Sequence, residues 1–338
     1  MKTMFRAAAV AAAITVGMAA GAVRAEAPTT LLNVSYDIAR ELYVQVNEAF
    51  GKAWKAKTGQ TVEISQSHGG SSRQARAIIE GLQADVVTFN QVLDVQALHD
   101  RGKLIPANWQ ARLPNNSSPY YSLPAFLVRK GNPKGIKDWN DLIRSDVESV
   151  FPNPKTSGNA RYTYLGAYAY ALDRNNSDQA KATEFVKALL ARVPVFDTGG
   201  RAATTTFVER QIGDVLITFE AEVYGIRREY GEDKFDIVVP SLSILAEFPV
   251  SVVDKVVDKR GSRELATAYL NFLYGPEGQD ILARNFNRIH DPEVAKRYEA
   301  QFPKLRLVTI EEVFGGWEKA NKDHFASGGI LDRVFVNR

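Results

Sequence analysis

Three loops combine serine, threonine and glycine at the points where helices are predicted to begin. They span residues 67–71 (Ser-His-Gly-Gly-Ser), 155–159 (Lys-Thr-Ser-Gly-Asn) and 197–200 (Asp-Thr-Gly-Gly). The start of a helix leaves four backbone N–H groups unpaired and carries a partial positive charge, so it can hold an anion without a cationic side chain. One such loop is more typical of an ordinary cap, but three on opposite sides of a predicted hinge favour an anion site between two lobes.

The same loops raise an enzymatic alternative, a secreted hydrolase with Ser71 or Ser157 as its nucleophile. The stretch from His68 to Ser71 is similar to the oxyanion-hole segment of some lipases, yet the chain has no G-x-S-x-G nucleophile elbow. It also lacks a phosphate-binding P-loop, an H-E-x-x-H pair and an EF-hand loop. We therefore expect no catalytic residues, and the hydrolase remains the alternative from a different class.

A metal site is not expected either. The chain has no cysteine, and its four histidines are scattered along the sequence. Tyr120 and Tyr121 are adjacent, and neighbouring tyrosinates can hold ferric iron in receptors. However, an aromatic pair beside proline is more typical of packing at a hinge, and no nearby histidine and carboxylate complete a ligand set. We predict neither a metal nor a cofactor.

Residues 1–25 have the features of an export signal. A charged start precedes an apolar run at 7–22, which is followed by a cleavage site of small residues. Removal of this segment takes away Lys2, Arg6 and Arg24 and no acid, so 42 basic residues become 39 against 39 acidic ones. A neutral mature chain gives no support to nucleic-acid binding. The signal predicts export to the periplasm.

The order of the predicted elements indicates an α/β fold. Strands near 31–35, 62–65 and 85–89 alternate with helices, which predicts a mostly parallel sheet covered on both faces. A second α/β set follows a segment near 119–130 that is expected to cross between lobes, and a long apolar stretch near 245–254 is the expected return crossing.

These crossings divide the mature chain into two predicted lobes. Residues 26–118 and 250–338 are expected to form the first lobe, and residues 119–249 the second. Each lobe is expected to be a mixed, mostly parallel sheet flanked by helices.

Eight segments in order, from 32 to 317, carry a family pattern. They include Gln66-Ser-His-Gly-Gly-Ser-Ser72, and the others are residues 32–43, 126–133, 153–158, 206–210, 243–247, 251–255 and 313–317. With these segments the chain resembles the periplasmic sulfate-binding proteins, the receptors of sulfate and thiosulfate ABC transporters. The resemblance implies a type II periplasmic binding protein fold, whose two lobes close over sulfate and which delivers the anion to a membrane permease.

The resemblance also implies a set of main-chain donors, carried over by position: Asp37, Ser71, Gly158, Asn159 and Gly200. It adds the hydroxyl of Ser157. Asp37 is expected to contribute its N–H, because a carboxylate aimed at a dianion would repel it. Apart from Asp37, the set lies at the three helix starts described above.

Two positions depart from the family pattern. Phe219 stands where sulfate receptors usually place a tryptophan whose indole N–H contacts the anion, and Asn159 stands where a glycine is expected. The loss of one hydrogen bond to a charged ligand costs about 1.5–3 kcal/mol, so thiosulfate or an organic sulfate ester stays open as the ligand. Asparagine tolerates positive φ, so the donor at 159 is expected to survive. Iron, molybdate or an organosulfonate remain further alternatives for this fold, and we expect a monomer.

Overall fold

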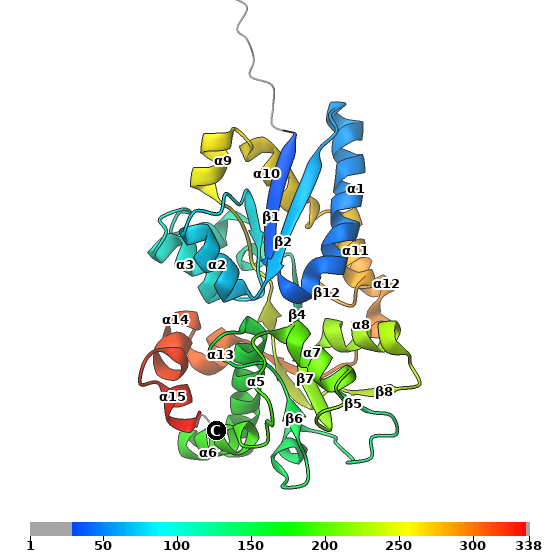
Figure 1. The fold of residues 1–338 in the computed structure, drawn as a ribbon, viewed down its shortest axis with the longest axis vertical. Coiled ribbons are helices and arrows are strands. Elements are labelled where there is room, and N and C mark those ends of the chain that lie inside the picture. Colours follow the sequence, from blue (N-terminus) through cyan, green and yellow to red (C-terminus); the bar gives the residue numbers. More distant parts are fainter. Residues whose placement is uncertain (1–28, 336–338) are drawn as a thin grey trace, which may run out of the picture.

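The computed structural model describes residues 29–335, and the predicted export signal lies outside this range. Two α/β lobes are stacked along the long axis of the molecule, and a narrow set of strands joins them (Figure 1). The type II periplasmic binding protein fold expected from the sequence is confirmed. None of the helices among residues 29–335 is both long enough and apolar enough to cross a membrane.

The first lobe is built on a four-stranded sheet with the order β11-β3-β1-β2. Its strands are β1 (Thr30–Tyr36), β2 (Glu63–Gly69), β3 (Val86–Thr88) and β11 (Val250–Val252). β1 pairs in parallel with β2 and β3, and β11 runs antiparallel to β3. The helices of this lobe are α1 (Arg40–Thr58), α2 (Ser71–Ile79), α3 (Val92–Asp100), α4 (Pro114–Ser117), α9 (Asp254–Arg260), α10 (Arg263–Phe272), α11 (Pro276–Arg284) and α12 (Pro292–Arg297), with short 3₁₀ turns η1 (Asp37–Ala39), η2 (Trp109–Arg112) and η4 (Glu299–Gln301).

Helix α1 shows how the sequence forms these elements. Tyr43, Val46, Phe50 and Trp54 recur every three or four residues and are buried against the sheet and the neighbouring helices. The helix ends at Gly59, whose φ of 76° is left-handed and whose N–H donates to the carbonyl of Lys55 at 2.8 Å. Glycine adopts this conformation without a steric penalty, so it terminates the helix at a defined residue.

The second lobe contains a four-stranded mixed sheet with the order β6-β7-β5-β8. Its strands are β5 (Pro124–Arg129), β6 (Ser149–Val150), β7 (Val215–Phe219) and β8 (Phe235–Val238), and a separate pair is formed by β9 (Leu242–Ile244) and β13 (Arg306–Val308). β6 and β7 are parallel, whereas β5, which enters from the hinge, runs antiparallel to both of its neighbours. The helices are α5 (Gly158–Arg174), α6 (Gln179–Leu190), α7 (Gly200–Val208), α8 (Glu220–Tyr230), α13 (Ile310–Phe314), α14 (Trp317–Ala320) and α15 (Ile330–Val334), with η3 (Trp139–Ile143) and the π-helical turn η5 (Asn321–Phe325).

The hinge is a three-stranded sheet between the lobes, with the order β10-β4-β12. Its strands are β4 (Tyr120–Ser122), β10 (Ala246–Glu247) and β12 (Arg288–Ile289). β4 and β10 lie in the two segments that were expected to cross between lobes. After β12 the chain crosses a third time, to β13, which pairs with β9 of the second lobe.

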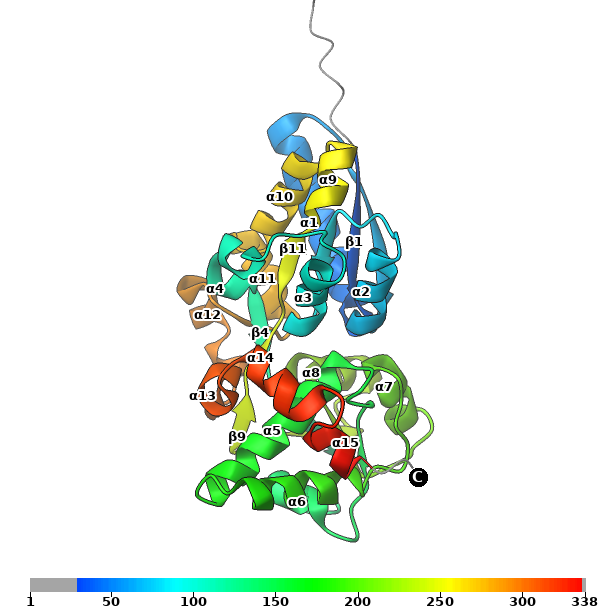
Figure 2. The same cartoon turned by 90° about the vertical axis from the view of Figure 1, so that its left-hand side faces the viewer.

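The third crossing corrects the predicted lobe boundaries. We expected residues 250–338 to remain in the first lobe, but β13 and the helices α13 to α15 pack on the second lobe, beside α5 and α6 (Figure 2). Trp317 packs edge-on against Tyr162 with ring centroids 5.2 Å apart, and the Tyr164 hydroxyl lies 3.0 Å from Nδ1 of His324. A three-residue strand is too short for a periodic pattern to show this return.

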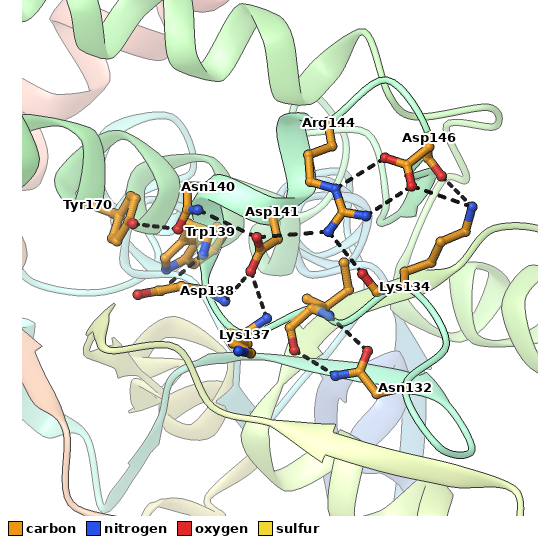
Figure 3. A network of polar contacts seen from close by, with 11 residues as sticks. Asn132, Lys134, Lys137, Asp138, Trp139, Asn140, Asp141, Arg144, Asp146 and Tyr170 are labelled. Carbon is orange, nitrogen blue, oxygen red and sulfur yellow. Dashed lines mark hydrogen bonds and ion pairs between the residues drawn. The ribbon is translucent and has the colours of Figure 1, made fainter.

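The segment between β5 and β6 is held by its own polar network (Figure 3). The Arg144 guanidinium donates to the Asp146 carboxylate and to the carbonyl of Lys134, and the Asn132 side chain bridges both backbone groups of Ile136. Asp138 and Asp141 form a capping box at the start of η3. These contacts satisfy the segment's own backbone and account for its charged residues without a ligand.

Candidate functional site

Helix starts from both lobes meet at the interface, and none is closed by a side-chain cap. α2, α5 and α7 begin after Gly70, Ser157 and Gly199, and no side chain at these positions accepts a hydrogen bond from the helix. Helices α3, α6, α12 and α13 do have a capping side chain. The serine and glycine residues of the three loops therefore leave the first donors of each helix open. A missing side-chain cap is not specific to these loops, because α1 and α8 to α11 also lack one.

The open donors are those implied for the anion site. No hydrogen-bond partner exists, within residues 29–335, for the backbone N–H groups of Asp37, Ser71, Gly158, Asn159 and Gly200. Four of these residues are buried, and Asp37 is partly exposed. Buried N–H groups are nearly always paired in native proteins, so a cluster of open donors indicates a site that binds an acceptor.

On one side, the two lobes touch through Asn90. The Ser71 hydroxyl donates to Oδ1 of Asn90, and a methyl group placed on Gly158 would lie 2.8 Å from that same oxygen. It would also lie 2.8 Å from Cβ of Gln91. The first turn of α5 therefore contacts the first lobe directly beside Ser71, and there is no room here for a side chain larger than hydrogen.

On the other side, the lobes touch through η1. A methyl group on Gly199 would lie 2.8 Å from a carboxylate oxygen of Asp37, and one on Gly200 would lie 3.3 Å from Cγ2 of Ile38. The Asp37 carboxylate is turned toward α7, where it accepts from the N–H of Arg201 at 3.4 Å. This placement agrees with the expectation that Asp37 offers its N–H, and not its carboxylate, to an anion.

Asn159 joins the starts of α5 and α7. Its Nδ2 lies 3.8 Å from a methyl group built on Gly200, and it donates to the Thr218 hydroxyl at 2.8 Å. Asn159 lies inside α5 and has no positive φ. Tolerance of positive φ is therefore not the reason that asparagine fits here, because its side chain forms a hydrogen bond in the second lobe.

A partly buried acid supports this junction. The Glu222 carboxylate accepts hydrogen bonds from the hydroxyls of Thr204 and Thr218, and Thr204 also donates to the carbonyl of Gly200. Burial raises the pKa of Glu222 to about 7, although the two threonine hydroxyls and Arg201 act to lower it. The network fixes α7 and α8 relative to the end of β7, so the donors of α5 and α7 are held in place from behind.

Phe219 is the predicted site residue that the structure does not bring to the donors by a direct contact. Its ring is buried between Tyr162 and Phe248, at centroid distances of 6.0 and 5.1 Å. It also lines a cavity of about 450 Å³ between α1 and α8, which contains Glu41, Glu222, Arg201 and Arg228 among its lining residues. None of the residues with open N–H groups lines this cavity, so the charged cavity and the donor cluster are neighbouring but distinct.

Ser71, Ser157 and Tyr120, on which the alternative interpretations depended, have other surroundings in the structure. In residues 29–335 no histidine is hydrogen-bonded to Ser71 or Ser157, and His68 instead contacts the carbonyl of Tyr36 at 3.1 Å. Tyr120 is fully buried and stacks on Phe248 at 4.9 Å, as expected for hinge packing. No group of three or more potential metal ligands occurs among the described residues.

Three contributors were not anticipated from the sequence: Asn90, Thr218 and Glu222. Asn90 follows β3, and Thr218 lies near the end of β7. The rule that ligands bind beyond the carboxyl ends of strands could have drawn attention to Asn90. Nothing in the sequence distinguishes Glu222 from the exposed Glu229 of the same helix, because its contacts with Thr204 and Thr218 depend on how α7 packs against β7.

The chain is similar in sequence and in fold to bacterial proteins that bind solutes outside the cell. Residues 42–287 match the family model described as bacterial extracellular solute-binding protein. The sulfate-binding protein of Salmonella typhimurium is 59% identical over 90% of this chain and 92% of the relative. The thiosulfate-binding protein of Pseudomonas aeruginosa is 52% identical over 99% of both chains. Among solved structures, the sulfate-binding protein SubI of Mycobacterium tuberculosis matches with a TM-score of 0.80 and 31% identity, over 88% of this chain and all of that one.

Proposed function

Because the chain belongs to the bacterial extracellular solute-binding proteins, and within them to the sulfate- and thiosulfate-binding receptors of ABC transporters, we propose that it captures sulfate in the cleft between its lobes. It then delivers the anion to the permease of its transporter. The proposed ligand donors are the N–H groups of the five residues with open donors and the hydroxyl of Ser157.

One observation carries this proposal: helix starts from both lobes converge, and their first N–H groups have no hydrogen-bond partner among residues 29–335. Arg201 and Arg161, in the first turns of α7 and α5, each face an acid across the interface, Arg201 with Glu41 at 2.6 Å and Arg161 with Asp94 at 3.7 Å. Peptide dipoles and N–H groups can stabilise a buried anion by themselves. A site made of donors suits sulfate, which is fully ionised at neutral pH and only accepts hydrogen bonds.

Discrimination against hydrogen phosphate is the first expected result. Hydrogen phosphate carries a proton that would face an N–H donor in the closed cleft, and a buried donor left unpaired in this way costs about 1–3 kcal/mol. We expect titration calorimetry at neutral pH to give an affinity for sulfate about 5- to 150-fold higher than for phosphate. Equal affinities would contradict a site made only of donors and would indicate that an acceptor such as Oδ1 of Asn159, which is buried without a partner in the described chain, faces the ligand.

Thiosulfate is the second candidate ligand, and Phe219 favours it. The terminal sulfur of thiosulfate is larger and a weaker acceptor than the oxygen it replaces, and sulfur contacts with aromatic rings contribute about 0.3–1.5 kcal/mol. A ring at 219 therefore penalises thiosulfate less than sulfate. The relatives include both kinds of receptor at similar identity.

Phe219→Trp tests this specificity. The indole N–H would restore a donor, so the ratio of sulfate to thiosulfate affinity is expected to rise by about one decade. The ratio is used because a larger ring in this buried position can lower the affinity for both anions equally. Phe235→Trp, in β8 away from the interface, should leave the ratio unchanged. An unchanged ratio for Phe219→Trp would show that the ring does not face the ligand.

The remaining features of the proposal follow from the receptor role. We place the working protein in the periplasm as a monomer, with no catalytic activity, and an organic sulfate ester is retained as a further ligand. We assign residues 26–118 and about 250–304 to the first lobe, and 119–249 with the C-terminal segment from 306 to the second. The assignment is supported by the pairing of β13 with β9 and by the packing of α13 to α15.

A further inference from the structure

Asp94 lies at the closed interface in an unusual electrostatic position. It is in the first turn of α3 and is only 5% exposed. Its neighbour across the interface is Arg161, which lies one turn after Gly158 in α5 of the second lobe. Since α5 carries proposed anion donors, any opening of the cleft that moves α5 from α3 also separates these two charges.

The contact between these charges is incomplete. Nη1 of Arg161 lies 3.7 Å from Oδ1 of Asp94, which is too far for a hydrogen bond. Oδ1 accepts from the Ser72 hydroxyl at 2.8 Å, whereas Oδ2 is buried and has no hydrogen-bond partner among the described residues. The guanidinium is directed elsewhere, to the carbonyl of Pro154 and toward the ring of Phe325.

An ion pair between the hinge and the second lobe shows what a complete contact looks like. Arg288 of the hinge binds Glu220 at the start of α8 in a bidentate manner, with distances of 2.6 and 2.9 Å. Both Glu220 oxygens are paired, whereas Asp94 has one unpaired oxygen and one distant cation. A buried ion pair contributes favourably only when its geometry and its remaining hydrogen bonds are good. The free energy lost when closure removes Asp94 from water is therefore expected to exceed the free energy gained from its pairing with Arg161.

From this geometry we propose that Asp94 disfavours the closed form of the empty receptor, so that the cleft remains open until an anion supplies the energy for closure. This inference rests on the proposed function, because it concerns the step that follows anion capture. When the lobes separate, the Asp94 carboxylate is hydrated. When they close, this hydration is lost and only the weak interaction with Arg161 replaces it. Burial accordingly raises the pKa of Asp94, while Arg161 and Ser72 act in the opposite direction.

The consequence is a lower anion affinity than the donors alone would provide. An anion that binds the closed form has an apparent affinity reduced by the fraction of receptor able to close. Asp94 would therefore set both the affinity and the population of the empty closed form. A closed but empty receptor is unproductive, because it excludes the anion and presents the closed surface without cargo.

Asp94→Asn tests the proposal, since the amide keeps the shape and the Ser72 hydrogen bond but removes the charge. We expect sulfate and thiosulfate to bind about tenfold more tightly by titration calorimetry. Small-angle X-ray scattering of the anion-free variant should show a smaller radius of gyration than the wild-type protein. Asp100→Asn, an exposed change of equal charge at the end of the same helix, should alter neither quantity.

Arg161→Gln supplies the opposite test. It removes the cation that the second lobe brings to Asp94 on closure, while Arg101 of the first lobe stays. We therefore expect several-fold weaker binding, and this loss should largely disappear when Asp94→Asn is also present. Weaker or unchanged binding by Asp94→Asn, or scattering identical to that of the wild-type protein, would overturn the proposal. If the wild-type protein binds none of the anions, the proposed function fails, but scattering of the empty variants still decides the role of Asp94.

Discussion

Replacing Ser71 by proline is expected to weaken sulfate binding by about one to two decades while the protein remains folded. The substitution removes one backbone N–H from the proposed site, and a hydrogen bond to a charged ligand is worth about 1.5–3 kcal/mol. Ser71 is the first residue of α2, where proline is well tolerated because this N–H has no partner in the helix. Gly70 has φ of −55° and ψ of 131°, a conformation that a following proline accepts.

The proline variant also removes the Ser71 hydroxyl, so a matched control is needed. Ser71→Ala keeps the N–H and loses only the contact with Asn90. The difference between the two variants in calorimetric affinity isolates the backbone donor, and unchanged melting temperatures without anion show that α2 is intact. If alanine and proline weaken binding equally, the N–H of Ser71 is not a ligand donor and the site is placed wrongly.

Gly158→Ala is expected to weaken binding by up to about two decades through a different cause, namely incomplete closure. The added methyl group would lie 2.8 Å from Oδ1 of Asn90 and from Cβ of Gln91, closer than such atoms approach. Cβ of Gln91 is fixed by the backbone, so the lobes must separate, and overpacking of this kind costs about 1–3 kcal/mol. Alanine favours helices more than glycine does, so α5 itself should not be weakened.

Scattering and affinity together identify this effect. With saturating sulfate, the Gly158→Ala protein should retain a larger radius of gyration than the wild-type complex. Gly225→Ala is the matched control, because it lies in α8 of the same lobe and a methyl group there meets no atom within 4 Å. A Gly158→Ala protein that closes fully and binds normally would mean that the contact with Asn90 and Gln91 is not part of the closed state.

The three helix starts could be predicted because their signal is local. Serine and glycine before an apolar-periodic segment mark the start of a helix wherever they occur, and α2, α5 and α7 begin within a few residues of the expected points. The sequence could also show that the loops belong to different lobes, because Tyr121–Arg129 reads as a crossing strand. The structure has β4 and β5 in this place.

The contacts between lobes could not be predicted in the same way. That Gly158 meets Asn90, or that Arg161 meets Asp94, depends on how two separately folded units are oriented, and neither partner has a local signature. The third crossing was missed for a related reason. The residues that hold the C-terminal segment on the second lobe, such as Trp317 against Tyr162, are far apart in the sequence and have no shared period.

That third crossing has a practical consequence. Thr30 begins β1 in the first lobe and Val334 ends α15 in the second lobe, so the two ends of the described chain lie on different lobes (Figure 1). Donor and acceptor fluorophores attached near these two positions would follow each opening and closing event as a change in energy transfer, with no label in the cleft. The topology of the chain thus provides a route to an optical reporter of occupancy.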